Sequence, residues 1–487
     1  MLDIQRKLSK SFYVILSLPA TAMGFALSVQ ISALSWILST KYGLKIDDVG
    51  LVWAAGPIAG ILGQIIFGII SDNVWFWGGR RRPFILIGGV LASLALLALP
   101  NIDVISSTLG FDGILGVAIA VALSLDLAIN VGFNPTRSII ADVTPEGVER
   151  TKGYTWMQTI SGTFGVLAYV IGAIWNNYIL IYTGVILVFI LSVFPPFFIE
   201  EPRKLNTNDN NSFNGKTSAL QILNDIRPLW GFLIYAVYAI IARLSGNESN
   251  KYIIYLTIVI TFYFILETLL KRNSTEETSE NGKMEFRKIL AAHSFTWIGI
   301  QTMFVYMFAY VQYKVYGFSD SSVIPQETQI EMGRIVSISF LILNAVGALL
   351  PAFVLEPFAR KFGRVRVHTL SIAIMAIGYA GILFFGYSAF AIYLFMIVLG
   401  IGWASTISLP FAIMSQKVEQ SKMGLYMGLF NLSVVLPQLV ASFGIGQAVN
   451  EASDKSLIFI IATISLAISA ALWFFIKEDG VSTEVIK

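Results

Sequence analysis

The sequence predicts an all-α protein that crosses a membrane many times, built as two six-helix halves with an extra two-helix hairpin between them. Of its 487 residues, 56% are hydrophobic and only 13% are charged, whereas a soluble domain carries roughly a quarter charged residues. Apolar runs of about 20 residues, the length that spans a bilayer as a helix, follow one another along the chain. This composition excludes an ordinary soluble enzyme, and a net charge of +3 is too small to imply a nucleic-acid partner.

Six apolar runs, separated by short polar or glycine-containing breaks, predict the helices of the first half, residues 1–199. We expect these spans at 11–39, 49–71, 84–100, 113–141, 154–175 and 178–199. The segment before residue 11 is polar, and the apolar run after it is far too long for a signal peptide. No cleaved leader is therefore expected.

The central segment, residues 200–291, holds two further apolar runs, 229–242 and 252–270. Both of its flanks are basic, with Arg203, Lys204 and Arg227 before the runs and Lys271, Arg272, Arg287 and Lys288 after them. Because basic loops stay in the cytoplasm, the two runs fit only a hairpin, 229–270, that leaves and returns on the same side. The run 229–242 is short for a span.

Six more apolar runs predict the second half, residues 292–487. They lie at 292–313, 335–355, 367–386, 389–414, 424–449 and 457–476. With a cytoplasmic N-terminus, most of the 33 lysines and arginines fall in loops and termini on the inner side. We expect a multi-pass protein of the cell (inner or plasma) membrane with both termini in the cytoplasm.

The two halves repeat one another, as a comparison of their loops indicates. In each half a carboxylate at the end of a span precedes a Gly-Arg pair by the same distance, and a proline lies within a later span. The matched positions are Asp72 with Glu356, Gly79-Arg80 with Gly363-Arg364, and Pro135 with Pro410. Transporters built from such repeats carry their substrate site near the bilayer midplane.

Asp126 stands out because it lies at the centre of the span 113–141, in a chain with few ionisable residues inside its spans. A charged carboxylate there costs at least a few kcal/mol and marks a proton or substrate path by default. Asn130 and Arg137 follow on the same face of the expected helix. Arg137 lies roughly 16 Å further along the axis, too far for a direct ion pair with Asp126, so each charge needs other partners.

Two interpretations of these residues stay open. In the functional one, Asp126 takes up a proton from outside and releases it inside, while Asn130 and Arg137 present hydrogen-bond donors to a polyol. In the structural one, Asp126 and Arg137 join helices through polar neighbours, and Arg137 extends toward the cytoplasmic headgroups. We favour the functional interpretation.

Neutral amides within other spans form a second set of candidates. Amide side chains hydrogen-bond well to sugar hydroxyls, but they also tie membrane helices together. The substrate-binding candidates besides Asn130 and Arg137 are Gln30, Gln64, Asn344, Asn431 and Gln438.

The arginine-rich loop after the second span predicts a conformational latch. A carboxylate at a helix end beside arginines can form ion pairs in one conformation and break them in another, as alternating access requires. The plain alternative is the usual basic inner loop. Because the second half repeats the pattern, we favour the latch, with members Asp72, Arg80, Arg81, Arg82, Glu356, Arg360 and Arg364.

The sequence has few of the residue types that form catalytic and metal sites. It has no cysteine and two histidines, which excludes thiolate sites and leaves too few imidazoles for a histidine-rich metal site. One acid in a span, with no histidine near it in sequence, does not make a hydrolytic pair. We expect no catalytic residue, no metal, no cofactor and no enzyme activity.

Several stretches, three in the first half and three in the second, match a known family in order along the chain. They are GPIAG at 56–60, GRRRPFI at 79–85, Asp126 with Arg137, VYG at 315–317, SLPFA at 408–412 and Asn431 with Gln438. In these stretches the chain resembles the plant sucrose transporters and their bacterial and animal proton–sugar relatives. That family lies within or beside the glycoside-pentoside-hexuronide cation symporters of the major facilitator superfamily.

The resemblance implies a major facilitator fold and a proton-coupled symporter that imports a disaccharide or glucoside, of the sucrose or maltose type, by alternating access. It gives the role of proton acceptor to Asp126 and makes Arg137 a sugar contact or an aid to proton coupling. Proteins of this fold usually work as single chains, so we expect a monomer. Its partners would be a sugar, a proton and the lipid bilayer.

Two other transport mechanisms stay open. A sodium-coupled glycoside symporter would need several carboxylates converging on the cation, and the span 49–71 contains none. A proton-coupled exporter of drugs or small metabolites would have a mostly apolar cavity, whereas the amides named above suit a polyol. The sequence therefore favours a proton-driven sugar importer.

Overall fold

The computed structural model describes residues 3–60, 70, 74–110, 113–145, 148–203, 219–245, 250–270, 278–319, 322–418 and 423–478. Over these ranges the chain is helical, with no strand beyond an isolated bridge between Phe76 and Gly79. Twelve of the described helical segments are long and apolar enough to cross a membrane. The protein is thus an all-α, multi-pass membrane protein, and the predicted fold class is confirmed.

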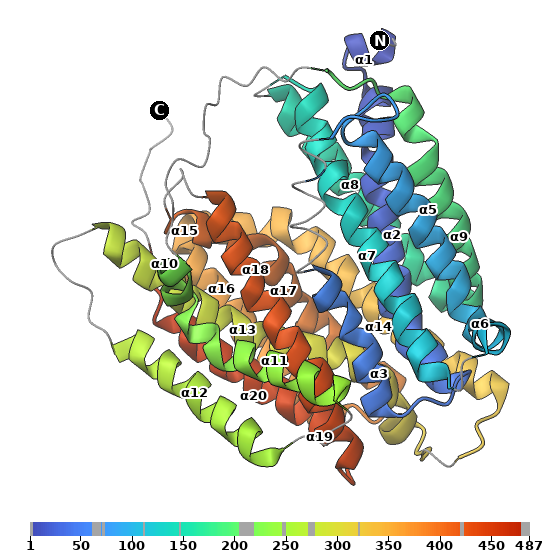
Figure 1. Ribbon diagram of the computed structural model, residues 1–487. Helices are drawn as coiled ribbons and strands as arrows, with labels where there is room; N and C mark the ends of the chain where they lie inside the picture. The colour runs from blue at the N-terminus through green and yellow to red at the C-terminus, as the bar shows by residue number, and fades with distance from the viewer. Residues whose placement is uncertain are drawn as a thin grey trace. The chain divides into compact units, whose positions relative to one another are not determined.

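The first half of the chain, up to residue 203, consists of helices joined by short loops in its described part (Figure 1). They are α1 (Asp3–Arg6), α2 (Lys10–Thr40), α3 (Ile46–Trp53), α5 (Arg82–Ala98), η1 (Leu99–Asn101), α6 (Ile102–Leu109), α7 (Ile114–Val143), α8 (Val148–Ile174), α9 (Asn177–Val193) and η2 (Pro195–Phe198).

The central segment and the second half follow. Their elements are α10 (Ala219–Asp225), η3 (Arg227–Leu229), α11 (Trp230–Leu244), α12 (Lys251–Leu270), α13 (Thr278–Tyr310), η4 (Val311–Val315), α14 (Gln326–Leu350), η5 (Pro351–Leu355), α15 (Glu356–Phe362), α16 (Arg364–Phe385), α17 (Ala389–Ser415), α18 (Met423–Val440), η7 (Ala441–Ile445), α19 (Gly446–Glu451) and α20 (Leu457–Phe474).

The helix α13 begins well before residue 292, where the sequence placed its start. Hydropathy alone predicts a loop for the charged turns at its beginning. Buried ion pairs neutralise these charges. Arg287 Nη2 lies 3.2 Å from Asp225 Oδ1, and Lys288 Nζ lies 2.8 Å from Glu285 Oε1. The membrane-length segment consequently runs from Gly282 to Val315.

Two other predicted spans differ in extent. The span expected at 84–100 continues through α6 to Leu109. The span expected at 49–71 is described only as α3 and the helical residues 55–60, because 61–69 and 71–73 lie outside the described residues.

The chain divides into two compact units. The first contains Met1–Asn208 with Val305–Leu341, and the second contains Asp209–Phe304 with Ile342–Lys487. One boundary follows Asn208, and the other two fall within α13 and α14. The division into 1–199, 200–291 and 292–487 stays a prediction.

In the first unit, α2 packs against α7, α8 and α9, and α5 packs against α7 and α9 (Figure 1). Small residues permit the close approach that membrane helices favour. A Cβ added at Gly88 of α5 would lie 2.9 Å from the carbonyl oxygen of Ala128 in α7, and one at Gly132 would lie 2.7 Å from Met23 Sδ in α2. These contacts hold α7 firmly between α2 and α5.

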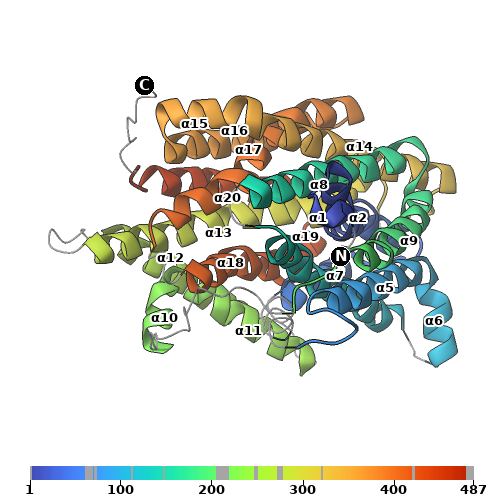
Figure 2. The ribbon, with the colours of Figure 1, turned by 90° about the horizontal axis from the view of Figure 1, so that it is seen from above.

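In the second unit, α16 packs against α17 and α20, while α11 packs against α12 and α18 (Figure 2). The helices α11 and α12 thus lie paired within this unit. A Cβ added at Gly444 in η7 would lie 2.6 Å from Tyr235 Oη of α11, and Arg227 Nη1 lies 2.9 Å from Glu267 Oε1 of α12. With 15 residues, α11 is short for a span, and the hairpin's passage through the membrane stays a prediction.

Candidate functional site

Asp126 lies at the middle of α7 and is 6% exposed. Gln30 of α2, also buried, donates from Nε2 to Asp126 Oδ2 at 3.0 Å. A Cβ added at Gly56 would lie 3.3 Å from Asp126 Oδ1, so the backbone of helical residues 55–60 packs against the same carboxylate. The sequence predicted the buried acid, and the structure adds these two neighbours.

The electrostatic setting of Asp126 is unusual for a buried carboxylate. Among the described residues, no ion pair reaches it, and the Gln30 amide is its side-chain hydrogen-bond donor. Burying an ionised carboxylate without a cation is costly. The site therefore suits a group that spends part of its working cycle neutral.

Gln30, predicted as a sugar contact, lies beside Asp126, the predicted proton acceptor. Its Oε1 is buried without a hydrogen-bond partner in the described part of the chain. An amide carries both donors and an acceptor, and its orientation can reverse by a rotation about its last bond. Gln30 can thus donate to ionised Asp126 and accept from the protonated form.

Asn130 and Arg137 follow Asp126 along α7, as predicted. Asn130 is half-buried, and its Nδ2 donates to the backbone oxygen of Asp126 at 2.8 Å. The Arg137 guanidinium is 5.2 Å from the centre of the Phe133 ring, and Tyr154 Oη donates to its backbone oxygen at 3.2 Å. Arg137 is exposed, so its donors are accessible to a solute.

The second unit gathers amides and tryptophans in one cluster. Gln438 Nε2 donates to Gln301 Oε1 at 3.1 Å, and Trp403 Nε1 donates to Asn344 Oδ1 at 3.3 Å. The Trp297 and Trp403 rings meet edge to face with centroids 6.4 Å apart. We call these five residues the amide–aromatic cluster.

Two of the predicted sugar contacts, Asn344 and Gln438, lie in this cluster. Asn431 lies half-buried on α18, and Gln64 lies outside the described residues. His293 was missed by the sequence reasoning, which set both histidines aside. Its Nε2 accepts from Trp297 Nε1 at 2.9 Å, a contact that the one-turn spacing of the two residues could have indicated.

The arginine loops are held by carboxylates that the sequence reasoning did not select. Glu201 accepts from the backbone N–H groups at the start of α5, at 2.8 Å from Arg80, 2.9 Å from Arg81 and 2.7 Å from Arg82. Arg81 Nε also lies 3.2 Å from Asp142 Oδ2 of α7, and both side chains are buried. Of the predicted latch, Asp72 lies outside the described residues.

The second half repeats this arrangement with Glu478. That carboxylate accepts from the backbone N–H groups of Arg364, Val365 and Arg366, at 3.0, 2.9 and 3.3 Å. An added Cβ would lie 2.5 Å from Glu201 Oε1 at Gly79 and 2.4 Å from Glu478 Oε2 at Gly363, so a side chain at either position would displace the capping carboxylate.

The other predicted latch residues of the second half pair within one helix. Arg360 Nη2 lies 2.5 Å from Glu356 Oε1, one turn away on an exposed face. Such exposed pairs contribute little to stability.

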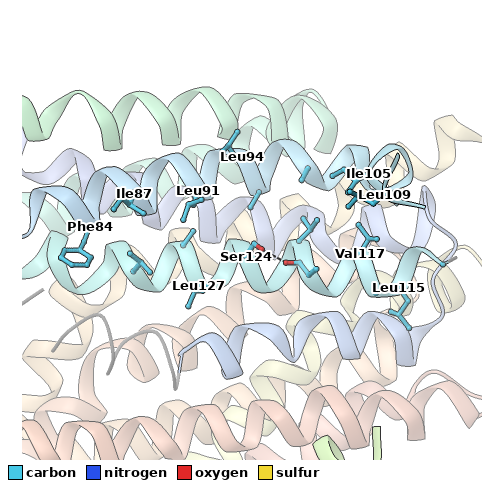
Figure 3. Close-up of a pocket in the computed structure, with 18 residues that line it drawn as sticks. Phe84, Ile87, Leu91, Leu94, Ile105, Leu109, Leu115, Val117, Ser124 and Leu127 are labelled. Carbon is cyan, nitrogen blue, oxygen red and sulfur yellow. Dashed lines mark hydrogen bonds between the residues drawn. The ribbon is translucent and has the colours of Figure 1, made fainter. Parts of the chain in front are cut away.

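A cavity of about 910 Å³ lies between α5, α6 and α7 (Figure 3). Its lining is apolar apart from Ser124, whose hydroxyl donates to the Ala120 oxygen of its own helix at 2.7 Å. Asp126 does not line it. A surface without free donors or acceptors suits lipid chains and not a sugar.

Comparison with known proteins gives a family match over most of the chain. The model of the Major Facilitator Superfamily matches residues 16–442. Sucrose transport protein SUC4 of Arabidopsis thaliana is 25% identical over 477 residues, 90% of this chain and 84% of that protein. The general alpha-glucoside permease of Schizosaccharomyces pombe is 29% identical over 174 residues, 32% of this chain and 31% of that protein.

Solved structures show the same fold. The xylose transporter XylE from E. coli matches with a TM-score of 0.59 at 13% identity, covering 96% of this chain and 97% of that one. The POT family transporter PepTSo matches with a TM-score of 0.64 at 14% identity, covering 95% and 96%.

Proposed function

Because this chain belongs to the Major Facilitator Superfamily, we propose that it is a proton-coupled symporter that imports a disaccharide or glucoside by alternating access, with Asp126 as proton acceptor. It is a transporter and not an enzyme. Its sucrose-transporting and alpha-glucoside-transporting relatives support a sugar of the sucrose or maltose type. The basic inner loops support a cell-membrane protein with both termini in the cytoplasm. We further propose that it works as a single chain.

The observation that carries this proposal is the isolation of Asp126. A buried carboxylate beside one amide, and without an ion pair among the described residues, can exchange a proton without breaking a salt bridge. Gln30 can serve both protonation states, since it offers a donor and an unused acceptor. A proton can therefore be held at Asp126 while the protein changes conformation.

The order of events follows from charge. Protonation from outside neutralises Asp126, which lowers the cost of enclosing the group when the path to the outside closes. Opening to the inside hydrates the carboxyl, and the proton leaves toward the lower proton concentration. Coupling requires that the sugar-loaded protein change conformation readily only when Asp126 carries its proton.

We assign sugar binding to two groups of side chains. The amide–aromatic cluster offers amides for hydroxyls and tryptophan faces for the C–H face of a pyranose ring, as buried aromatic residues commonly do. In the first unit, Asn130 and Arg137 offer further donors. Gln64 and Asn431 stay candidates on the basis of the sequence.

Uptake into proteoliposomes tests the proposal. A panel of radiolabelled sucrose, maltose, trehalose and hexoses is offered with and without an inward proton gradient. We expect accumulation of at least one α-glucoside that depends on the gradient and is lost with a proton uncoupler. Accumulation that needs sodium and ignores the uncoupler would contradict proton coupling, and gradient-driven efflux without uptake would indicate the exporter instead.

A further inference from the structure

His293 is a buried titratable residue of the second unit that the proton path does not use. It lies on α13 and is 2% exposed. Its ring stacks on Phe430 of α18, with centroids 4.7 Å apart and planes 20° apart. Phe430 in turn meets Phe411 of α17 edge to face at 4.9 Å. These aromatic contacts fix the plane of the imidazole.

The hydrogen bond of His293 determines which of its nitrogens carries the proton. Nε2 accepts from Trp297 Nε1 at 2.9 Å, and because an indole N–H only donates, Nε2 carries no proton. The neutral imidazole then carries its proton on Nδ1. That atom is buried and has no hydrogen-bond partner among the described residues. In the described part of the chain, the polar contact of His293 is therefore with the amide–aromatic cluster.

Stability does not account for a histidine at this position. A buried N–H without a partner destabilises the folded protein. A leucine between Phe430 and Trp297 would leave no such group at position 293 and would still pack against the aromatic rings. Polar groups that break the rule of buried hydrogen bonding are expected at functional sites. The exception at His293 points to the residue that it holds, Trp297.

Trp297 connects His293 with the second tryptophan of the cluster. Its ring meets that of Trp403 edge to face, with centroids 6.4 Å apart. Other contacts confine Trp403, since its Nε1 donates to Asn344 Oδ1 at 3.3 Å and a Cβ added at Gly347 would lie 2.7 Å from its Cδ1. Of these neighbours, Trp297 is the one whose orientation depends on a hydrogen bond to His293.

We propose that His293 is a positioning residue of the sugar site, which holds the Trp297 ring against Trp403 through Nε2. The planes of the two tryptophan rings meet at 80°, so one ring can cover a face of a pyranose while the other borders its edge. Both tryptophans are half-buried and can contact a solute, whereas His293 is too buried to touch the sugar and acts through Trp297.

The hydrogen bond contributes to affinity by fixing this corner before the sugar arrives. Without it, the Trp297 ring can rotate about its side-chain bonds, and ordering the ring on binding would cost free energy. The proposal rests on the proposed transport function, because the orientation of the rings matters to a sugar only if the cluster binds one.

Variants along the contact test the proposal through KM. His293→Leu removes the acceptor, so we expect KM for the transported sugar to rise about tenfold with a nearly unchanged maximal rate. His293→Gln offers an amide oxygen near the position of Nε2 and should restore most of the affinity. Trp297→Phe removes the donor, and adding His293→Leu to it should raise KM no further. Independent, multiplying effects of these two changes would overturn the proposal.

The second histidine of the chain provides a matched control. His368 on α16 is also fully buried, and its Nδ1 lies 2.7 Å from Ser405 Oγ. Its ring meets Trp473, which lies outside the cluster, edge to face at 4.3 Å. Ser405 follows Trp403 by two residues and so lies on the opposite face of α17. We expect His368→Leu to leave KM unchanged. An equal rise in KM for both histidine variants would indicate a general packing effect and overturn the proposal.

Fluorine NMR on protein that carries fluorinated tryptophan needs no sugar, so it separates positioning from transport. The chain has ten tryptophans, and phenylalanine at Trp297 and Trp403 in turn assigns their two signals. We expect His293→Leu to shift or broaden both signals and His293→Gln to return them toward their natural positions. His368→Leu should move the signal of Trp473 and leave these two nearly in place.

The two measurements together separate the possible failures. A Trp403 signal that His293→Leu does not affect would overturn the proposal, as would affected signals in a variant with normal KM. Affected signals in a protein whose natural form transports no sugar would retain the positioning contact and reject the proposed function.

Discussion

The helices α7 and α17 occupy matching places in the two halves, yet their centres differ. Both contain a buried proline, Pro135 and Pro410, at the positions that the repeat predicts. At its centre α7 carries Asp126 beside Gln30, whereas α17 carries Trp403 bonded to Asn344. Under the proposed function, the duplicated scaffold carries different chemistry in each copy, with the proton acceptor in the first half and the aromatic sugar contact in the second.

The largest expected effect is the loss of coupling in Asp126→Asn. The amide keeps the shape of the carboxyl but cannot take up or release a proton, so we expect accumulation against a gradient to fall to the level of empty liposomes. Exchange of labelled for unlabelled sugar should persist because it needs no net proton transfer. Asp103→Asn, which changes a carboxylate paired with Lys41 at the surface, should behave as the natural protein.

Removing Trp403 should mainly weaken sugar binding. Trp403→Ala deletes a large aromatic contact of the kind that carries about 1–3 kcal/mol in binding sites, so KM should rise about fivefold to 150-fold. Initial uptake rates over a range of sugar concentrations measure this. A normal KM with a lower maximal rate would instead assign Trp403 to the conformational change.

The amide beside Asp126 should affect rate more than affinity. Gln30→Leu removes a hydrogen bond to an ionised group, worth about 1.5–3 kcal/mol, and leaves the deprotonated state without a donor. We expect the maximal rate of uptake to fall about tenfold or more, with KM for sugar nearly unchanged. A rise in KM for sugar without a change in the maximal rate would indicate that Gln30 contacts the sugar, as the sequence predicts.

The loops at Arg80 and Arg364 have the same structure in the two halves, since a glutamate accepts from backbone N–H groups in each. The same change in each loop should therefore have the same effect. Glu201→Ala and Glu478→Ala each remove the acceptor for three backbone N–H groups at a helix start. A cap of this kind contributes about 1–2 kcal/mol, so both variants should melt a few degrees lower in detergent. Arg360→Ala, which breaks only an exposed pair, should change the melting temperature least.

Hydropathy and charge were sufficient for the fold because membrane spans obey a local rule, about 20 apolar residues with basic inner loops. The rule did not predict the start of α13, because Arg287 and Lys288 there are neutralised by Asp225 and Glu285 within the protein. Asp126 could be found for the same local reason, as a carboxylate in an apolar run.

Its surroundings could not be found in this way. The contacts of Gln30 with Asp126, of Glu201 with the loop at Arg80 and of Gln438 with Gln301 join residues far apart in sequence. Each involves a common polar residue whose role depends on the packing of whole helices, which a single sequence does not specify.

If Asp126 carries the proton that drives sugar uptake, the movement of that proton can be measured directly. Sugar is added to lightly buffered proteoliposomes that contain the transporter, and the external pH is followed while membrane potential is clamped. We predict that a transported sugar makes the medium more alkaline with the natural protein, and that Asp126→Asn exchanges the same sugar without a pH change. Sugar-dependent alkalinisation by Asp126→Asn equal to that of the natural protein would contradict the account.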